Sequence, residues 1–197
     1  ARVACVPWAI PARKPATDFK KRRDIAFIGD YRHAPNLDAA RWFVDAILPD
    51  LRAKDPTLQV WLVGAHLPPH LSWPEGVRVV GHVADLDAEV LDRVRLTIAP
   101  LRFGAGIKGK VLESLAAGVP CVMTLTAAEG LKLPSALAPL VAKDEKALKT
   151  RIRTLYADPD RCQTLSKKAQ AYAASSFSEE RTTHLLRAAI KMARQPR

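Results

Sequence analysis

The chain has 197 residues, of which 48% are hydrophobic and 26% charged, with a formal net charge of +11. This length is enough to bury a substantial core, and the composition is that of an ordinary globular protein, which excludes disordered and fibrous classes. No apolar run approaches the roughly 18 residues that a membrane-spanning helix requires.

The N-terminus lacks both an initiator Met and the apolar stretch of a signal peptide, since the chain opens with ARVACVPW. We therefore expect a fragment that begins partway through a longer protein. The three cysteines, Cys5, Cys121 and Cys162, are far apart and have no metal-ligand spacing. They indicate a reducing, cytoplasmic setting and no metal site, with Cys121 as a small core residue.

Positive charge is concentrated at the two ends of the chain. Residues 1–35 contain 8 Lys and Arg against 3 Asp and Glu, residues 36–142 contain 10 against 11, and residues 143–197 contain 13 against 6. Nucleic-acid binding is the weaker interpretation, because only 6% of residues are aromatic and no nucleic-acid motif is present. A peripheral contact with anionic lipid, on the inner face of a membrane, or a contact with a partner domain remains open.

Strands and helices are predicted to alternate after a Pro-rich linker at residues 1–23. Short apolar runs predict strands at 25–29, 58–64, 77–81, 96–100, 120–124 and 139–142. Apolar residues at helical spacing predict helices at 37–51, 85–94, 111–117, 144–156, 159–175 and 178–193, with Asp158 and Ser178 as N-caps. This order predicts a Rossmann-like α/β domain with a parallel sheet, in which ligands bind at the carboxyl ends of the strands.

The most informative stretch is Pro100–Cys121, PLRFGAGIKGKVLESLAAGVPC. A glycine-rich turn between a strand and a helix directs backbone N–H groups and the positive end of the helix dipole toward one point, which suits a phosphate. Lys108 and Lys110 add mobile positive charges. Glu113, one turn into the helix, is predicted to face the same ligand and to accept hydrogen bonds from ribose hydroxyls. Alternatively, the glycines only turn the chain and the lysines are solvated.

Five segments, in this order, resemble the C-terminal, donor-binding half of a GT-B glycosyltransferase of glycosyl transferases group one, also called family four. They are IGDYRHAPNLDAARWFV, VWLVG, VRVVGHVADL, LTIAPLRFGAGIKGKVLESLAAGVPCV and TAAEGL. The resemblance implies transfer of a sugar from a UDP- or GDP-linked donor to a polysaccharide, lipid-linked glycan or protein, usually with retention and without a cofactor or metal. It also implies that the N-terminal acceptor domain is absent, that residues 24–175 bind the donor, and that the helix at 176–197 crosses to the missing domain.

Matching the family motif residue by residue gives an expected site. Lys110, Lys108 and Arg32 are expected to stabilise the departing diphosphate, with Glu113 on the ribose. Contacts with the donor are expected from Gly29, His82, Gly104, Gly106, Ile107, Gly109, Glu113 and Glu129. For His82 the contact is expected from the backbone rather than the side chain, and Glu129 is equally well explained as an acid at a helix start.

Two positions depart from the family. The first Glu of the E-x7-E motif is replaced by Ala105, which leaves the donor sugar open, and a Lys of the first loop is replaced by Asn36. Arg32 is expected to supply the missing cation. Ala105 keeps open a second function, a non-catalytic nucleotide-binding scaffold. A nucleotide-sugar epimerase is a third, for which no suitable His and carboxylate set is identified.

Overall fold

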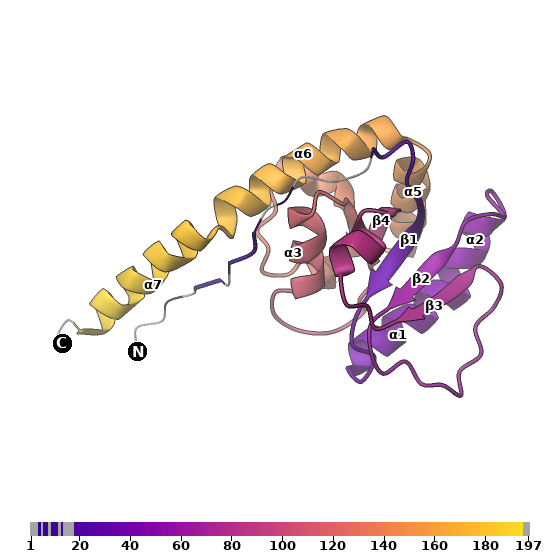
Figure 1. The fold of residues 1–197 in the computed structure, drawn as a ribbon, viewed down its shortest axis with the longest axis horizontal. Helices are drawn as coiled ribbons and strands as arrows, with labels where there is room; N and C mark the ends of the chain where they lie inside the picture. Colours follow the sequence, from indigo (N-terminus) through magenta and orange to yellow (C-terminus); the bar gives the residue numbers. More distant parts are fainter. Residues whose placement is uncertain (1–3, 5, 8, 12, 14–17, 195–197) are drawn as a thin grey trace.

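A six-stranded parallel sheet lies at the centre of the structure, with the strands in the order β3-β2-β1-β4-β5-β6 (Figure 1). The computed structural model describes residues 4, 6–7, 9–11, 13 and 18–194. The strands are β1 (Arg23–Ile28), β2 (Val60–Val63), β3 (Val77–Gly81), β4 (Val94–Ala99), β5 (Cys121–Thr124) and β6 (Val141–Ala142). The predicted Rossmann-like α/β fold is therefore confirmed, with each predicted strand present.

Helices and tight helical turns connect the strands and continue beyond the last one (Figure 1). They are α1 (Ala34–Trp42), η1 (Phe43–Ile47), α2 (Leu48–Arg52), η2 (Asp87–Leu91), α3 (Gly109–Ala116), α4 (Leu125–Ala128), η3 (Ser135–Leu140), α5 (Glu145–Tyr156), α6 (Pro159–Ser176) and α7 (Glu179–Arg194). As predicted, Asp158 and Ser178 cap α6 and α7, because their side chains accept hydrogen bonds from Arg161 N and Arg181 N at 2.8 Å and 3.2 Å.

Three details differ from the prediction. The first helix begins at Ala34, because Pro35 suits the first turn of a helix, and it changes to a π-helical turn at η1. The segment after β5, predicted as a loop, contains the short helix α4, which Thr124 caps by accepting a hydrogen bond from Ala127 N. The sixth strand has only two residues, since the 3-10 turn η3 occupies the positions before it.

Alternate residues of β1 pack on opposite faces of the sheet, as the period of a strand requires. Ile25 and Phe27 belong to the larger core cluster, which includes residues of α1, α2 and α5. Ala26 belongs to a smaller cluster with Val90 and Leu91 of η2. Both faces of β1 are thus buried, which explains its continuous apolar sequence.

The N-terminal segment, defined here by Ile10, Pro11 and Arg13, lies against the C-terminal half of the domain. Ile10 N donates a hydrogen bond to Phe177 O, at the end of α6, over 2.8 Å. Residues 1–3, 5, 8, 12 and 14–17 of the predicted linker lie outside the described residues. Beyond this contact α7 runs outward in Figure 1, whereas α6 packs on the domain through buried residues such as Leu165 and Ala169.

Candidate functional site

Loops that follow β1, β4 and β5 meet at the carboxyl edge of the sheet. A Cβ built on Gly104, in the glycine turn after β4, would lie 3.8 Å from the side chain of Pro35 in the first loop. A Cβ built on Gly130, after β5, would lie 3.0 Å from Cγ1 of Ile107 in the same turn. The glycine turn is therefore in contact with the first loop on one side and with the loop after α4 on the other.

Lys110, in the first turn of α3, extends across this edge to the first loop. Its ammonium donates a hydrogen bond to Oδ1 of Asn36 and lies 4.6 Å from the centre of the Phe27 ring. Burial lowers the pKa of Lys110 to about 8, and the positive charge of Lys108 acts in the same direction. A largely buried ammonium whose hydrogen-bond partner is a neutral amide would be stabilised by an anion, because the anion offsets the cost of burying the charge.

Gly29 allows this approach because it has no side chain. A Cβ at Gly29 would lie 2.9 Å from the amide group of Asn36 and 3.2 Å from Nζ of Lys110. Gly29 N donates to Val63 O over 2.9 Å, so the backbone itself is fixed to β2. Gly29 thus leaves room for the Asn36 and Lys110 side chains at the end of β1, and its expected contact with the donor stays a prediction.

The start of α3 is not capped by a side chain. Lys108 occupies the N-cap position with extended backbone angles, and no side-chain cap hydrogen bond is formed there. Its ammonium bends back to donate to Gly106 O, and Gly106 has a φ of +73°. Gly109 is the first residue of the helix. An uncapped helix start with two lysines beside it is an arrangement that favours phosphate oxygens.

Arg32 is paired within its own loop rather than directed as a free cation into the site. Its guanidinium forms an ion pair with Asp30 at 2.8 Å, and His66 Nδ1 lies 3.0 Å from the same carboxylate. The Arg32 side chain is 67% exposed. Hydrogen bonds from Arg32 and His66 hold the pKa of Asp30 far below its usual range. The expected contribution of Arg32 is thereby reduced by a neighbouring negative charge.

Glu113 projects from the same helix toward η2. It lines a cavity of about 440 Å³ together with Asp85 and Asp87. Partial burial and the charge of Asp87 raise the pKa of Glu113, while Lys110 acts in the opposite direction. A carboxylate with a raised pKa at the rim of a cavity can accept hydrogen bonds from hydroxyl groups.

The remaining predicted residues are exposed and make no side-chain contact that links them to this centre in the described part of the chain. His82 follows β3, Glu129 follows α4, and Ala105 lies in the glycine turn. Of these, Glu129 is placed near the turn through its neighbour Gly130, whereas the His82 side chain is simply solvent-exposed. The expected contact of the His82 main chain with the donor stays a prediction.

Sequence reasoning missed two functional candidates. Asn36 was noted only as a replacement for a lysine, yet its amide accepts from Lys110 and donates to Asp30 O over 2.8 Å. His66 has a φ of +64° and contacts Asp30. Neither contact has a sequence signal, because the partners of His66 and Asn36 lie 36 and 74 residues away in the chain.

No group of three or more His, Cys, Asp or Glu side chains among the described residues is arranged to hold a metal ion. None of the helices in that part of the chain is both long and apolar enough to cross a membrane.

Several solved structures share this fold at low sequence identity. TarM matches with a TM-score of 0.77 and 10% identity over 95% of this chain and 38% of TarM. Sucrose-phosphate synthase from Thermosynechococcus elongatus matches at 0.70 and 17% over 95% of this chain and 52% of the other. Anabaena HepE in complex with UDP-glucose matches at 0.64 and 17% over 89% and 49%.

This chain therefore spans about half the length of these structures or less.

No curated protein matches the sequence. A sequence profile of one family, glycosyl transferases group 1, matches residues 22–158, which is most of the chain and includes the glycine turn, α3 and the first loop. Together with a sheet order of β3-β2-β1-β4-β5-β6 and glycosyltransferase folds as its structural neighbours, this match settles the family. The chain belongs to the glycosyl transferases group 1.

Proposed function

We propose that this chain is the donor-binding half of a retaining glycosyltransferase. It binds a UDP- or GDP-linked sugar at the carboxyl edge of the sheet, with the diphosphate at the start of α3 and the ribose at Glu113. The observation that carries the proposal is Lys110, which lies against Asn36 and Phe27 beside Gly29. HepE, which shares the fold, was solved with UDP and with UDP-glucose, and this supports the ligand class.

The proposed chemistry is electrostatic. Negative charge develops on the diphosphate as the bond to the sugar breaks, and Lys110, Lys108 and the N–H groups at the start of α3 stabilise it. Arg32 contributes less, because Asp30 already neutralises it. Loss of one such donor in an active site costs on the order of 2–4 kcal/mol of transition-state stabilisation.

Calorimetric titration of the chain with UDP, GDP and ADP tests the donor site. We expect one nucleotide to bind, and Lys110→Ala to weaken its binding about 10- to 100-fold, the value of one charge-assisted hydrogen bond. Glu113→Ala should also weaken binding. Lys146→Ala on α5 and Glu180→Ala on α7 are matched controls, since both residues are exposed and far from the site in sequence. Equal losses in the control variants would contradict the assignment.

The complete reaction requires an acceptor-binding domain, which we place N-terminal to this chain. The same proposal assigns the enzyme to the cytoplasm, with a polysaccharide, lipid-linked glycan or protein as acceptor. Residues 1–23 would then connect the two domains and residues 176–197 would cross back to the first one. Sugar transfer measured with the longer protein, and its loss in Lys110→Ala, is the test of this part.

A non-catalytic nucleotide-binding scaffold is the second candidate, favoured by Ala105. This exposed residue stands where the family motif places a carboxylate for the donor sugar. A longer protein that binds nucleotide but neither transfers the sugar nor hydrolyses the donor would support the scaffold. Turnover with any acceptor would exclude it.

A further inference from the structure

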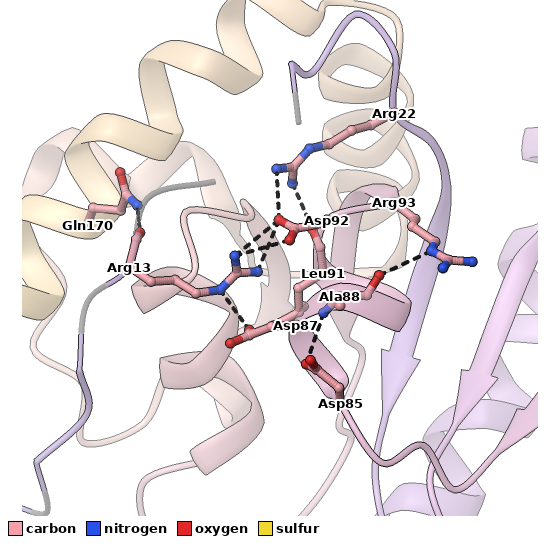
Figure 2. Close-up of polar contacts among 9 residues, drawn as sticks. All are labelled: Arg13, Arg22, Asp85, Asp87, Ala88, Leu91, Asp92, Arg93 and Gln170. Atoms are coloured by element: carbon pink, nitrogen blue, oxygen red, sulfur yellow. Dashed lines mark hydrogen bonds and ion pairs between the residues drawn. The ribbon is translucent and has the colours of Figure 1, made fainter. Parts of the chain in front are cut away.

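Arg13, in the N-terminal segment, is bound to two carboxylates of the segment that contains η2 (Figure 2). Its Nε lies 2.8 Å from Oδ1 of Asp87, and its two terminal nitrogens donate to the Asp92 carboxylate over 3.1–3.2 Å. The Arg13 side chain is only 25% exposed, and that of Asp92 only 14%. Burial opposes the charge on Arg13, but its bonds to Asp92 and Asp87 more than compensate and raise its pKa.

The backbone of Arg13 joins two further helices. Its N–H donates to Ala116 O at the end of α3 over 3.2 Å, and its carbonyl accepts from Nε2 of Gln170 on α6. Gln170 in turn packs against Gly118, where an added Cβ would lie 2.9 Å from the glutamine side chain. One residue of the N-terminal segment therefore holds η2, α3 and α6 together, as Figure 2 shows for the side chains.

Asp92 has a second cation. The Arg22 guanidinium lies 3.6 Å from Asp92 Oδ1 and donates to Leu91 O over 2.8 Å, and Arg22 is only 1% exposed. Asp92 is thus held between two arginines. Asp87, by contrast, is 49% exposed and is held by Arg13. Loss of Arg13 would leave Asp92 with a partner but would remove the neighbouring positive charge from Asp87.

Hydrogen bonds join the residues of the segment around η2, so this segment should move as one unit. Glu89 accepts from Asp85 N over 2.9 Å, and Asp85 accepts from Ala88 N over 3.0 Å. Arg93 donates to Ala88 O over 3.1 Å. Fixing this segment at Asp87 and Asp92 therefore also fixes the stretch around Asp85, which follows β3 and lines the same cavity as Glu113.

The cavity of about 440 Å³ lies between these elements, and its charged lining residues are Arg13, Asp85, Asp87 and Glu113. The positive charge of Lys110, on the same helix, lowers the pKa of Glu113. We propose that Arg13 is a positioning residue for the nucleotide site: it fixes the wall opposite Glu113 and offsets the negative charge of Asp87 that Glu113 faces. This inference rests on the proposed function, in which Glu113 binds the ribose.

Titration of the Glu113 carboxyl by NMR, without ligand, tests the electrostatic part directly. In Arg13→Ala we expect the pKa of Glu113 to rise by about 0.5, because Asp87 is then no longer offset. Asp87→Asn should lower it, and the double variant should resemble Asp87→Asn. Arg93→Ala is the matched control, since this arginine binds the same segment but no carboxylate of the cavity. An Arg13→Ala shift no larger than that of the control overturns the proposal.

Nucleoside diphosphate titration then tests the positioning part. Through the charge on Glu113, Arg13→Ala should weaken UDP binding up to about threefold, the largest change that a rise of about 0.5 in the pKa of Glu113 can produce, and this loss should shrink as the pH rises and Glu113 becomes ionised in both proteins. Arg13→Lys, which keeps the charge, should restore most of the affinity, and Asp87→Asn should reduce the effect of Arg13→Ala. A loss of affinity in Arg13→Ala no larger than that in Arg93→Ala contradicts the proposal. If the unaltered chain binds no nucleotide while Glu113 responds to Arg13, the proposed function fails and the coupling stands.

Discussion

Lys110 donates a hydrogen bond from its ammonium to Oδ1 of Asn36, which joins the start of α3 to the first turns of α1. This pair lies at the carboxyl edge of the sheet, where we propose that the donor binds. Burial of the ammonium lowers its pKa to about 8, although the Asn36 oxygen and the Phe27 ring lie beside it. The lowered pKa of Lys110 affects both nucleotide binding and the stability of the fold.

Nucleotide binding should be coupled to protonation of Lys110. A diphosphate favours the charged ammonium and raises its pKa, so binding near pH 8 should take up a fraction of a proton, and affinity should fall as the pH rises above about 8. Calorimetry in buffers of different ionisation enthalpy measures this uptake. It should disappear in Lys110→Ala. Uptake that persists in that variant would assign the proton to another group.

Removal of the Lys110 charge should stabilise the ligand-free protein. The pKa of Lys110 is lower in the folded than in the unfolded chain, so the unfolded state holds more protons between about pH 8 and 10.5, and stability rises with pH across that window. Below it the charged form is penalised in full. We expect Lys110→Met to increase the free energy of unfolding by about 1–2 kcal/mol at pH 7, after allowance for the lost hydrogen bond to Asn36.

Denaturant unfolding at pH 7 and pH 9.5 measures this effect. The gain from Lys110→Met should shrink at the higher pH, where the unaltered lysine is largely neutral in the folded state. A variant that is less stable at both values would show that the contacts of Lys110 with Asn36 and Phe27 outweigh its desolvation.

Gly29→Ala should damage the site more than the fold. The new methyl group would meet Asn36 at 2.9 Å and Lys110 at 3.2 Å, so both side chains must move. We expect a loss of about 1–3 kcal/mol in stability and a clear loss of nucleotide affinity. Gly81→Ala is the control: its methyl group meets nothing within 4 Å, and only its φ of +76° opposes the substitution. Equal affinities for Gly29→Ala and the unaltered chain would remove Gly29 from the site.

Asp30→Asn should tighten nucleotide binding, by about threefold. The substitution removes a negative charge from the first loop and releases Arg32 and His66, both of which contact Asp30. Arg32→Ala alone should have a small effect, since that guanidinium is paired and 67% exposed. In the Asp30→Asn background, however, Arg32→Ala should abolish the gain. Titration of the four proteins with the same nucleotide forms the double-mutant cycle, and additive effects would contradict the argument.

Ala105→Glu should distinguish nucleotide-sugar from nucleotide. A carboxylate in the glycine turn can accept hydrogen bonds from the hydroxyls of the donor sugar. Free UDP or GDP lacks these hydroxyls and offers only those of its ribose. We expect the affinity for the sugar-linked nucleotide to rise and that for the free nucleotide to stay unchanged. Ala105→Gln controls for size. A parallel change for both ligands would show that position 105 does not face the donor sugar.

Much of the fold follows from local sequence. Continuous apolar runs such as IAFIG and LTIAP belong to strands with both faces buried, and their alternation with helical segments leaves a parallel sheet as the consistent outcome. Caps such as Asp158 and Ser178 act within a few residues, so they are visible in the sequence. The glycine turn and its lysines are also local features, and their place between β4 and α3 was predicted.

The contacts that give the site its chemistry are decided by tertiary structure. Asn36 and Lys110 are 74 residues apart, and the pKa of Lys110 is lowered mainly by burial, which only the folded chain provides. Arg32 is a free cation in the sequence but is neutralised by Asp30 once the loop is folded. Sequence alone therefore determined that Lys108 and Lys110 lie at the carboxyl edge of the sheet, but it did not show that His66 joins them there. Only the folded chain decided which of them are desolvated or paired, because burial and partner distances depend on residues remote in sequence.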